Sequence, residues 1–196
     1  MNYISLFHTP LYIGEVTEDL SDLVSKCQSE REKSPGKVMS NKGGWQSNDF
    51  DGKEIESYVK DQLNEVAQNW GIRGLLSPSN CWYNINTSQN YNLQHDHPGS
   101  ILSGVLYLKC PENTGPIVFL NPVSSLINSY IEPYVDYDVS HELASSFTIC
   151  PNQGSLLIFP SWLGHRVDAA DYEGERISLS FNTKVEIPSI RDHDTL

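Results

Sequence analysis

Short segments of β-forming residues, separated by turn-forming residues, fill the chain from Pro78 onward and limit the fold more than any other feature. Runs rich in Val, Ile, Tyr, Phe and Leu alternate with Gly, Pro, Asn and Ser. This pattern predicts strands near residues 80–86, 92–97, 101–109, 116–120, 146–150, 154–160, 164–168 and 176–183. A succession of short strands is typical of an antiparallel sandwich or barrel.

Two amphipathic helices are predicted before these strands. The first covers about 18–33, with Thr17 as its N-cap, and the second covers about 53–70, before a stop at Gly71. Apolar residues recur at helical spacing in both, so each helix has one face to bury. We therefore expect a mainly β fold with N-terminal helices. Residues 1–196 are expected to form one domain, with a helical part over about 1–75 and a β core over about 78–190.

The stretch from 121 to 145 is a polar connection rich in Tyr, Ser and Asp. A connection of this length in a compact domain is often a lid or a binding loop. We expect Tyr130, Tyr134 and Tyr137 to line the entrance to a site.

Composition and charge argue against several classes of protein. The net charge is −12, so neither nucleic acid nor an anionic membrane surface is an expected partner. No apolar run approaches the ~20 residues of a spanning helix, and residues 1–10 do not resemble a signal peptide. The four cysteines include no CxxC pair. They are expected to be reduced thiols, and the expected location is the cytoplasm.

Three of the six histidines suggest a metal site. His95 and His97 stand in the sequence QHDHP, and residues two apart in an extended strand point to the same face. His165 lies 68 residues after His97. Two ligands close in sequence and a third from a distant strand can hold a metal and leave positions open for other ligands. The histidines alone do not decide the metal, because imidazole suits Zn, Cu, Fe and Ni.

The expected strand that begins at Arg176 has one polar and one apolar face. Its odd-numbered positions are apolar, and its even-numbered positions are Arg176, Ser178, Ser180 and Asn182. Such a strand can be an ordinary sheet edge with one face in water. It can also line a barrel that holds a charged ligand, because Arg binds a carboxylate through two parallel hydrogen bonds. Ser178 points the same way and can donate another.

Together these residues resemble the motif of the iron(II)- and 2-oxoglutarate-dependent oxygenases, which is a His-x-acid pair, a distant His and an Arg-x-Ser shortly after it. The chain resembles a subgroup of them found in marine bacteria and phages. The similar phrases are LFHTPL at 6–11, GGWQS at 43–47, HDHPGS at 95–100, LSGVLYL at 102–108 and FPSW at 159–162. The resemblance covers nearly the whole chain.

This resemblance implies a fold, an activity and a set of cofactors. The fold is a double-stranded β-helix, a jelly-roll or cupin-like sandwich of two four-stranded sheets. The cofactors are Fe(II), 2-oxoglutarate and O2. The activity is that of a dioxygenase, most simply a hydroxylase, that releases succinate and CO2.

The resemblance also implies roles for individual residues. His95 and His165 match the two histidines that bind iron. Arg176 matches the residue that binds the distal carboxylate of 2-oxoglutarate, with Ser178 beside it. Tyr107 stands where related enzymes have a tyrosine that bonds the same carboxylate. Asn84 and Asn92 are further candidates near the co-substrate.

The chain departs from the family motif at His97, where an Asp or Glu usually binds iron. We interpret His97 as the third ligand, on the argument that it shares a face with His95. Asp96 is an alternative ligand if a bulge re-aims it. In another alternative His97 is the first ligand and Gly99 leaves the carboxylate position vacant, as in halogenases of this fold.

Two other functions compete with an oxygenase. A non-catalytic cupin-like module would keep the histidines but has no use for an inward Arg176. A zinc hydrolase needs a general base, and no HExxH motif is present. The expected partner is a small-molecule or peptide substrate, and the sequence is also compatible with a homodimer.

Overall fold

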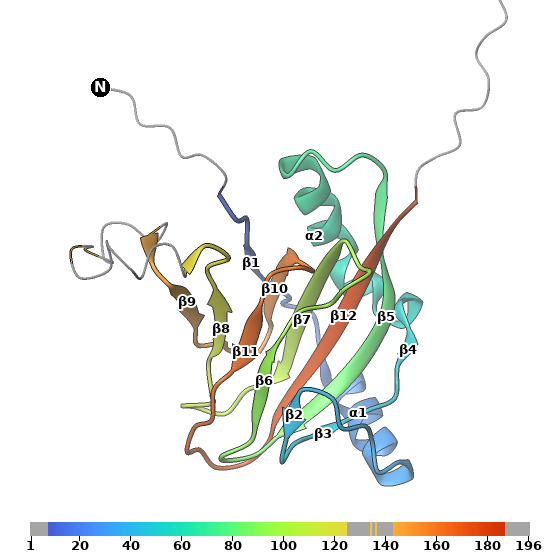
Figure 1. Ribbon diagram of the computed structural model, residues 1–196. Coiled ribbons are helices and arrows are strands. Elements are labelled where there is room, and N and C mark those ends of the chain that lie inside the picture. The colour runs from blue at the N-terminus through green and yellow to red at the C-terminus, as the bar shows by residue number, and fades with distance from the viewer. Residues whose placement is uncertain (1–7, 125–133, 135, 137–142, 187–196) are drawn as a thin grey trace, which may run out of the picture.

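Two antiparallel sheets packed face to face form the centre of the protein, and two helices cover the outer face of the larger sheet (Figure 1). The computed structural model describes residues 8–124, 134, 136 and 143–186. Within them, no helix is long and apolar enough to cross a membrane.

Each sheet contains four of the eight predicted strands, which confirms the double-stranded β-helix. The larger sheet runs in the order β1 (Tyr12–Glu15), β10 (Ser155–Pro160), β7 (Leu102–Lys109), β12 (Arg176–Glu186), β5 (Leu75–Asn86) and β3 (Trp45–Gln46), and β4 (Phe50–Asp51) also pairs with β5. The smaller sheet runs in the order β2 (Asn41–Lys42), β6 (Tyr91–His95), β11 (His165–Val167), β8 (Ile117–Leu120) and β9 (Ser146–Ile149). Strands β1 to β4 were not predicted, because segments of two to four residues show too little periodicity.

The helices are α1 (Ser21–Lys33) and α2 (Glu56–Asn69), and each is shorter than predicted at its start. Thr17 is not the N-cap of α1: the Asp19 carboxylate accepts a hydrogen bond from the Ser21 amide at 2.9 Å, and the helix begins there. Before α2, the 3-10 turn η1 (Gly52–Glu54) is capped by Asp51, which accepts from the Lys53 amide. Gly71 follows α2 with a φ of 67°, as its predicted role as a stop requires.

Strand β5 begins before Pro78, although the prediction placed no strand there. Pro78 has no amide hydrogen and is disfavoured inside a sheet. The register between β5 and β12 shifts between the pairs Phe181–Cys81 and Thr183–Pro78. This bulge accommodates the proline and lets β5 continue.

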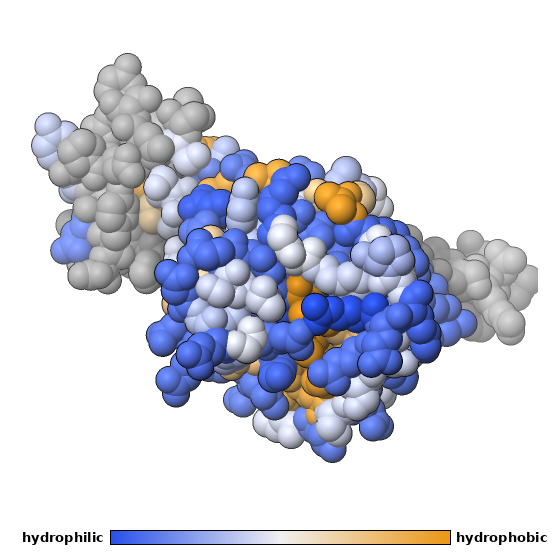
Figure 2. Space-filling model, turned by 90° about the horizontal axis from the view of Figure 1, so that it is seen from below, coloured by the Kyte–Doolittle hydropathy of each residue, from blue (hydrophilic) through white to orange (hydrophobic). Residues whose placement is uncertain are grey.

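Strand alternation divides the apolar residues into two cores. On β7, Leu106 and Leu108 belong to the core between the sheet and the helices, whereas Val105 and Tyr107 belong to the core between the two sheets. The apolar odd-numbered residues of β12 also pack toward the helices. The even face of β12 therefore points between the sheets, as its polar pattern allowed. Seen from below, the surface is largely hydrophilic, with hydrophobic residues visible in a hollow near its centre (Figure 2).

Candidate functional site

All eight predicted site residues line one cavity between the two sheets: Asn84, Asn92, His95, His97, Tyr107, His165, Arg176 and Ser178. Its volume is about 50 Å³, several times what one water molecule needs. One wall is the even face of β12 with its neighbours β5 and β7, and the opposite wall comes from β6 and β11.

His95, His97 and His165 form the single group with metal-binding geometry found among the described residues. Their candidate ligand atoms all lie within 4.8 Å of one another. Strand pairing places His95 directly opposite His165, with ring centroids 4.4 Å apart. The His97 ring lies 5.1 Å from each of the other two, and its amide donates to the Ser161 carbonyl at 2.8 Å. Three imidazoles thus converge on one point.

A bulge in β6 allows His95 and Asn92 to share the cavity. Residues three apart in a regular strand face opposite sides. Here Asn92 pairs with Val167 and His95 pairs with His165, so two residues of β6 lie opposite Arg166 alone. The extra residue re-aims the strand, and both side chains face inward.

Hydrogen bonds and burial prepare the imidazoles to bind a metal. The Nδ1 atoms of His95 and His165 lie 2.7 and 2.9 Å from the carbonyls of Leu93 and Leu163. Because a carbonyl only accepts, each Nδ1 carries the proton and each Nε2 keeps its lone pair. Burial lowers the pKa of His165 to about 3 and that of His97 to about 4, and it also lowers the pKa of His95. All three imidazoles are therefore neutral at pH 7, as metal binding would require.

Arg176 is a buried cation whose charge is not paired with any described carboxylate. Its side chain is 3% exposed. Its Nη1 donates to the Gly115 carbonyl at 2.6 Å, while its Nε has no hydrogen-bond partner among the described residues. A buried, unpaired charge is costly unless a counter-ion arrives. The donor set therefore fits an anionic ligand with two oxygen atoms.

Tyr107, Ser178 and Asn84 surround Arg176 on adjacent strands. Ser178 pairs with Tyr107 on one side and with Asn84 on the other, so the three share the inner face next to Arg176. Burial raises the pKa of Tyr107 to about 12, and its hydroxyl remains a donor.

Asn84 adds an amide with one unused atom. Its Nδ2 donates to Ser180 at 3.2 Å, and its buried Oδ1 has no partner among the described residues. The two amide atoms have the same shape and are assigned by their bonds. Exchanging them lets the Ser180 hydroxyl donate to the amide oxygen and frees the amide nitrogen to donate into the cavity.

Asn92 approaches the cavity from the smaller sheet. Its Nδ2 donates to Ser40 at 3.2 Å, and its Oδ1 accepts from Asn86 at 3.5 Å. The bond from Asn86 joins the two sheets, and each amide atom of Asn92 keeps one further hydrogen-bonding position. Asp96 is exposed and lies outside the histidine group.

Several cavity residues were not predicted. Trp82 lies two residues from Asn84 on β5, and its ring is 5.5 Å from that of His97, so strand alternation could have found it. Gln46 pairs with Asn84 from β3, a strand too short to predict. Of the tyrosines expected at the entrance, Tyr134 is 87% exposed, whereas Tyr130 and Tyr137 lie outside the described residues.

Solved structures of similar fold include several oxygenases. A prolyl-4-hydroxylase from Pseudomonas putida has a TM-score of 0.60 at 15% identity, covering 91% of this chain and 94% of that one. A prolyl hydroxylase from Trichoplax adhaerens, in complex with a peptide fragment of hypoxia inducible factor, has a TM-score of 0.60 at 14% identity, covering 88% of this chain and 82% of that one. The α-ketoglutarate-dependent carbocyclase SnoK from nogalamycin biosynthesis has a TM-score of 0.63 at 10% identity, covering 89% of this chain and 79% of that one. At these identities the likeness shows the fold.

Sequence comparison identifies the family. Among curated proteins, no relative matches the chain. The family described as "Putative 2OG-Fe(II) oxygenase" matches residues 80–182. That match covers more than half of the chain and includes every predicted site residue. The chain therefore belongs to the iron(II)- and 2-oxoglutarate-dependent oxygenases.

Proposed function

We propose that His95, His97 and His165 hold Fe(II), that Arg176 holds the distal carboxylate of 2-oxoglutarate, and that the enzyme hydroxylates a small-molecule or peptide substrate. The observation that carries this proposal is the buried Arg176 without a described counter-ion, on the same cavity as three converging imidazoles. A metal-binding module without a co-substrate gives no reason to bury that charge.

The co-substrate end of the cavity is built to hold an anion. Arg176 offers its free Nε–H next to Ser178 and Tyr107, whose hydroxyls can donate to the same carboxylate. Charge-assisted bonds of this kind are about twice as strong as neutral ones. Asn84, with its amide nitrogen turned inward, adds a donor farther along the cavity.

The histidines and the apolar walls perform the other tasks of the protein. Fe(II) and 2-oxoglutarate together supply the oxidising chemistry, in which O2 and the keto acid are consumed, succinate and CO2 are released, and a substrate C–H becomes an alcohol. The neutral imidazoles provide lone pairs that suit Fe(II). The Phe159 ring, 4.8 Å from His165, and the Trp82 ring beside His97 limit the access of water to this end of the cavity.

The test is calorimetry of 2-oxoglutarate binding to protein loaded with Mn(II) under anaerobic conditions. Wild type is expected to bind the keto acid only when the metal is present. Arg176→Ala and Arg176→Lys should weaken binding by about 2–5 kcal/mol, because the lysine ammonium does not reproduce the guanidinium fork. Both should still bind Mn(II), which shows that they fold.

Arg73→Ala removes an exposed arginine and serves as the matched control. It should bind 2-oxoglutarate as wild type does. Unchanged affinity in a folded Arg176→Ala protein would remove the main support for this function.

A further inference from the structure

The inner face of the larger sheet carries a second polar group, at the end opposite Arg176. Along β12, the inward residues after Arg176 are Ser178 and Ser180, which line the cavity, and then Asn182. Six residues of strand span about 20 Å. The five-carbon chain of 2-oxoglutarate, with four C–C bonds of about 1.5 Å each, is much shorter. The co-substrate held at Arg176 leaves the Asn182 end free.

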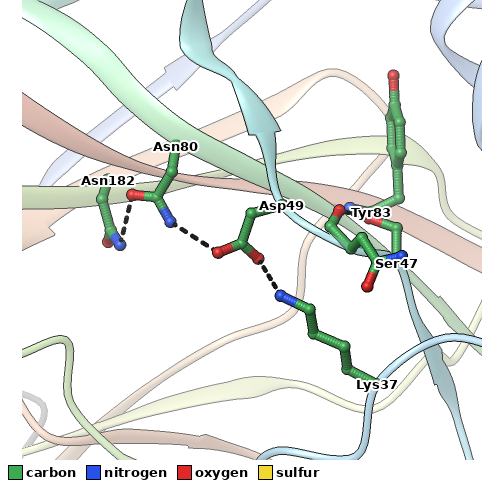
Figure 3. A network of polar contacts seen from close by, with 7 residues as sticks. Lys37, Ser47, Asp49, Asn80, Tyr83 and Asn182 are labelled. Carbon is green, nitrogen blue, oxygen red and sulfur yellow. Dashed lines mark hydrogen bonds and ion pairs between the residues drawn. The ribbon is translucent and has the colours of Figure 1, made fainter.

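Two asparagine amides lie side by side at this end (Figure 3). The Asn182 Nδ2 donates to the Asn80 Oδ1 at 3.2 Å, and the Asn80 Nδ2 donates to Asp49 at 3.4 Å. Lys37 in turn forms an ion pair with Asp49 at 3.0 Å. On the other side, Ser103 donates to the Asn182 Oδ1 at 2.8 Å. These five side chains, from Ser103 through the two asparagines and Asp49 to Lys37, form the amide row. It crosses β7, β12 and β5 and ends at the sheet's edge.

The amide row adjoins the candidate metal centre. Asn80 precedes Trp82 by two residues on β5, and Trp82 contacts His97. Ser103 also bonds Ser161 at 2.8 Å, and the Ser161 carbonyl accepts the His97 amide. A ligand seated on the amides would therefore lie beyond the histidines, on the side away from Arg176.

The unused hydrogen-bonding positions of the row define what it can bind. Each amide nitrogen has two hydrogens and uses one in a bond within the row, while the Asn182 oxygen accepts one bond and has capacity for a second. The row is uncharged, since its one ammonium and one carboxylate pair with each other. Donors and an acceptor side by side, without net charge, match the C=O and N–H of another amide.

We propose that Asn80 and Asn182 form the substrate subsite and that they recognise an uncharged amide group next to the carbon that is oxidised. This inference rests on the proposed function and narrows its substrate class. The amide can belong to a peptide backbone or to a carboxamide side chain. A phosphate or carboxylate would need a free cation, and Lys37 is already neutralised.

The test follows binding near the metal without turnover. N-acetyl-alanine N-methylamide represents the backbone amide and propionamide represents the carboxamide. Free alanine and inorganic phosphate are the charged comparisons. Each is added anaerobically to protein holding Mn(II) and 2-oxoglutarate, and the paramagnetic relaxation of its protons is compared with a Zn(II) sample.

We expect at least one uncharged amide to bind close to Mn(II) and the charged compounds to bind at least tenfold more weakly. Asn182→Asp and Asn80→Asp replace donors with acceptors and add a charge, so they should lower amide binding at least tenfold. Asn152→Asp makes the same change at an exposed position just before β10, away from the amide row. This control variant should bind the amide as wild type does.

The outcomes separate this inference from the function on which it rests. Wild type that fails to bind 2-oxoglutarate with Mn(II) overturns both. Wild type that binds 2-oxoglutarate but no amide, or binds alanine or phosphate equally well, overturns the substrate class alone. Equal amide binding by wild type and both aspartate variants overturns the assignment of Asn80 and Asn182.

Discussion

At the scale of single residues, His97 changes the charge of the candidate metal centre. The family motif has a carboxylate where this chain has an imidazole, so three neutral imidazoles in the proposed centre would leave both charges of a divalent ion uncompensated. Imidazole suits Fe, Ni and Zn, whereas carboxylate suits Mn and Mg. On the proposed ligand set, the residue at position 97 would therefore affect both metal affinity and metal selectivity.

Replacing His97 with Asp should retain the site and shift its preference. We expect His97→Asp to bind Mn(II) at least as tightly as wild type, with a ratio of Mn(II) to Ni(II) affinity that rises about tenfold or more, because one hard anionic oxygen replaces a nitrogen. Competition titrations with both metals measure the ratio. His8→Asp, at an exposed position, should leave it unchanged. An unchanged ratio in His97→Asp would show that residue 97 does not contact the metal.

At the scale of elements, one close approach between β7 and β12 supports the larger sheet. Gly104 faces Phe181 across the strand pair. A Cβ at position 104 would lie 2.3 Å from the Phe181 ring, and that ring is fully buried. The glycine therefore makes room for the aromatic side chain that joins the sheet to the helices.

Gly104→Ala should destabilise the fold by overpacking. We expect the free energy of unfolding to fall by about 1–3 kcal/mol, as for other enlarged core residues, and urea denaturation measures it. Gly164→Ala is the control, because its Cβ would have no neighbour closer than 3.9 Å. Its effect should stay within about 0.5 kcal/mol. A loss in Gly104→Ala no larger than in this control would contradict the packing argument.

At the scale of the whole molecule, the buried histidines make stability depend on pH. An unfolded histidine has a pKa of about 6.5, whereas burial lowers the pKa of His165 to about 3 and of His97 to about 4 in the folded protein. Below pH 6.5 the unfolded chain binds protons that the folded chain does not. The contribution of these histidines to the free energy of unfolding is therefore fully present above this pH. It is lost as the pH drops toward their pKa values in the folded protein.

Metal-free protein should lose on the order of 2–4 kcal/mol of unfolding free energy between pH 7.5 and pH 5. Urea denaturation at the two pH values measures this loss. His165→Leu should show a smaller loss because it lacks one buried imidazole. His8→Leu should behave as wild type. Equal pH dependence in wild type and His165→Leu would mean that His165 does not carry this effect.

Local patterns in the sequence predicted much of the fold and of the candidate site. The eight central strands, the alternation of β12 and the same-face relation of His95 and His97 all follow from neighbours in the chain, because side-chain direction in a strand repeats every two residues. The family motif then pointed to Arg176, Ser178 and Tyr107. The two-residue strands β2, β3 and β4 could not be found, since they exist only through pairing with distant strands.

By itself, the sequence determined which residues form strands, which face each side chain takes and which residue types could bind a metal and a carboxylate. The tertiary structure decided their partners: His165 opposite His95, the β6 bulge that turns Asn92 inward, and the Gly115 carbonyl that holds Arg176. It also brought Asn80 and Asn182 together across 102 positions of the chain. The physical reason is that side-chain direction depends on adjacent residues, whereas strand register depends on packing between segments far apart in sequence.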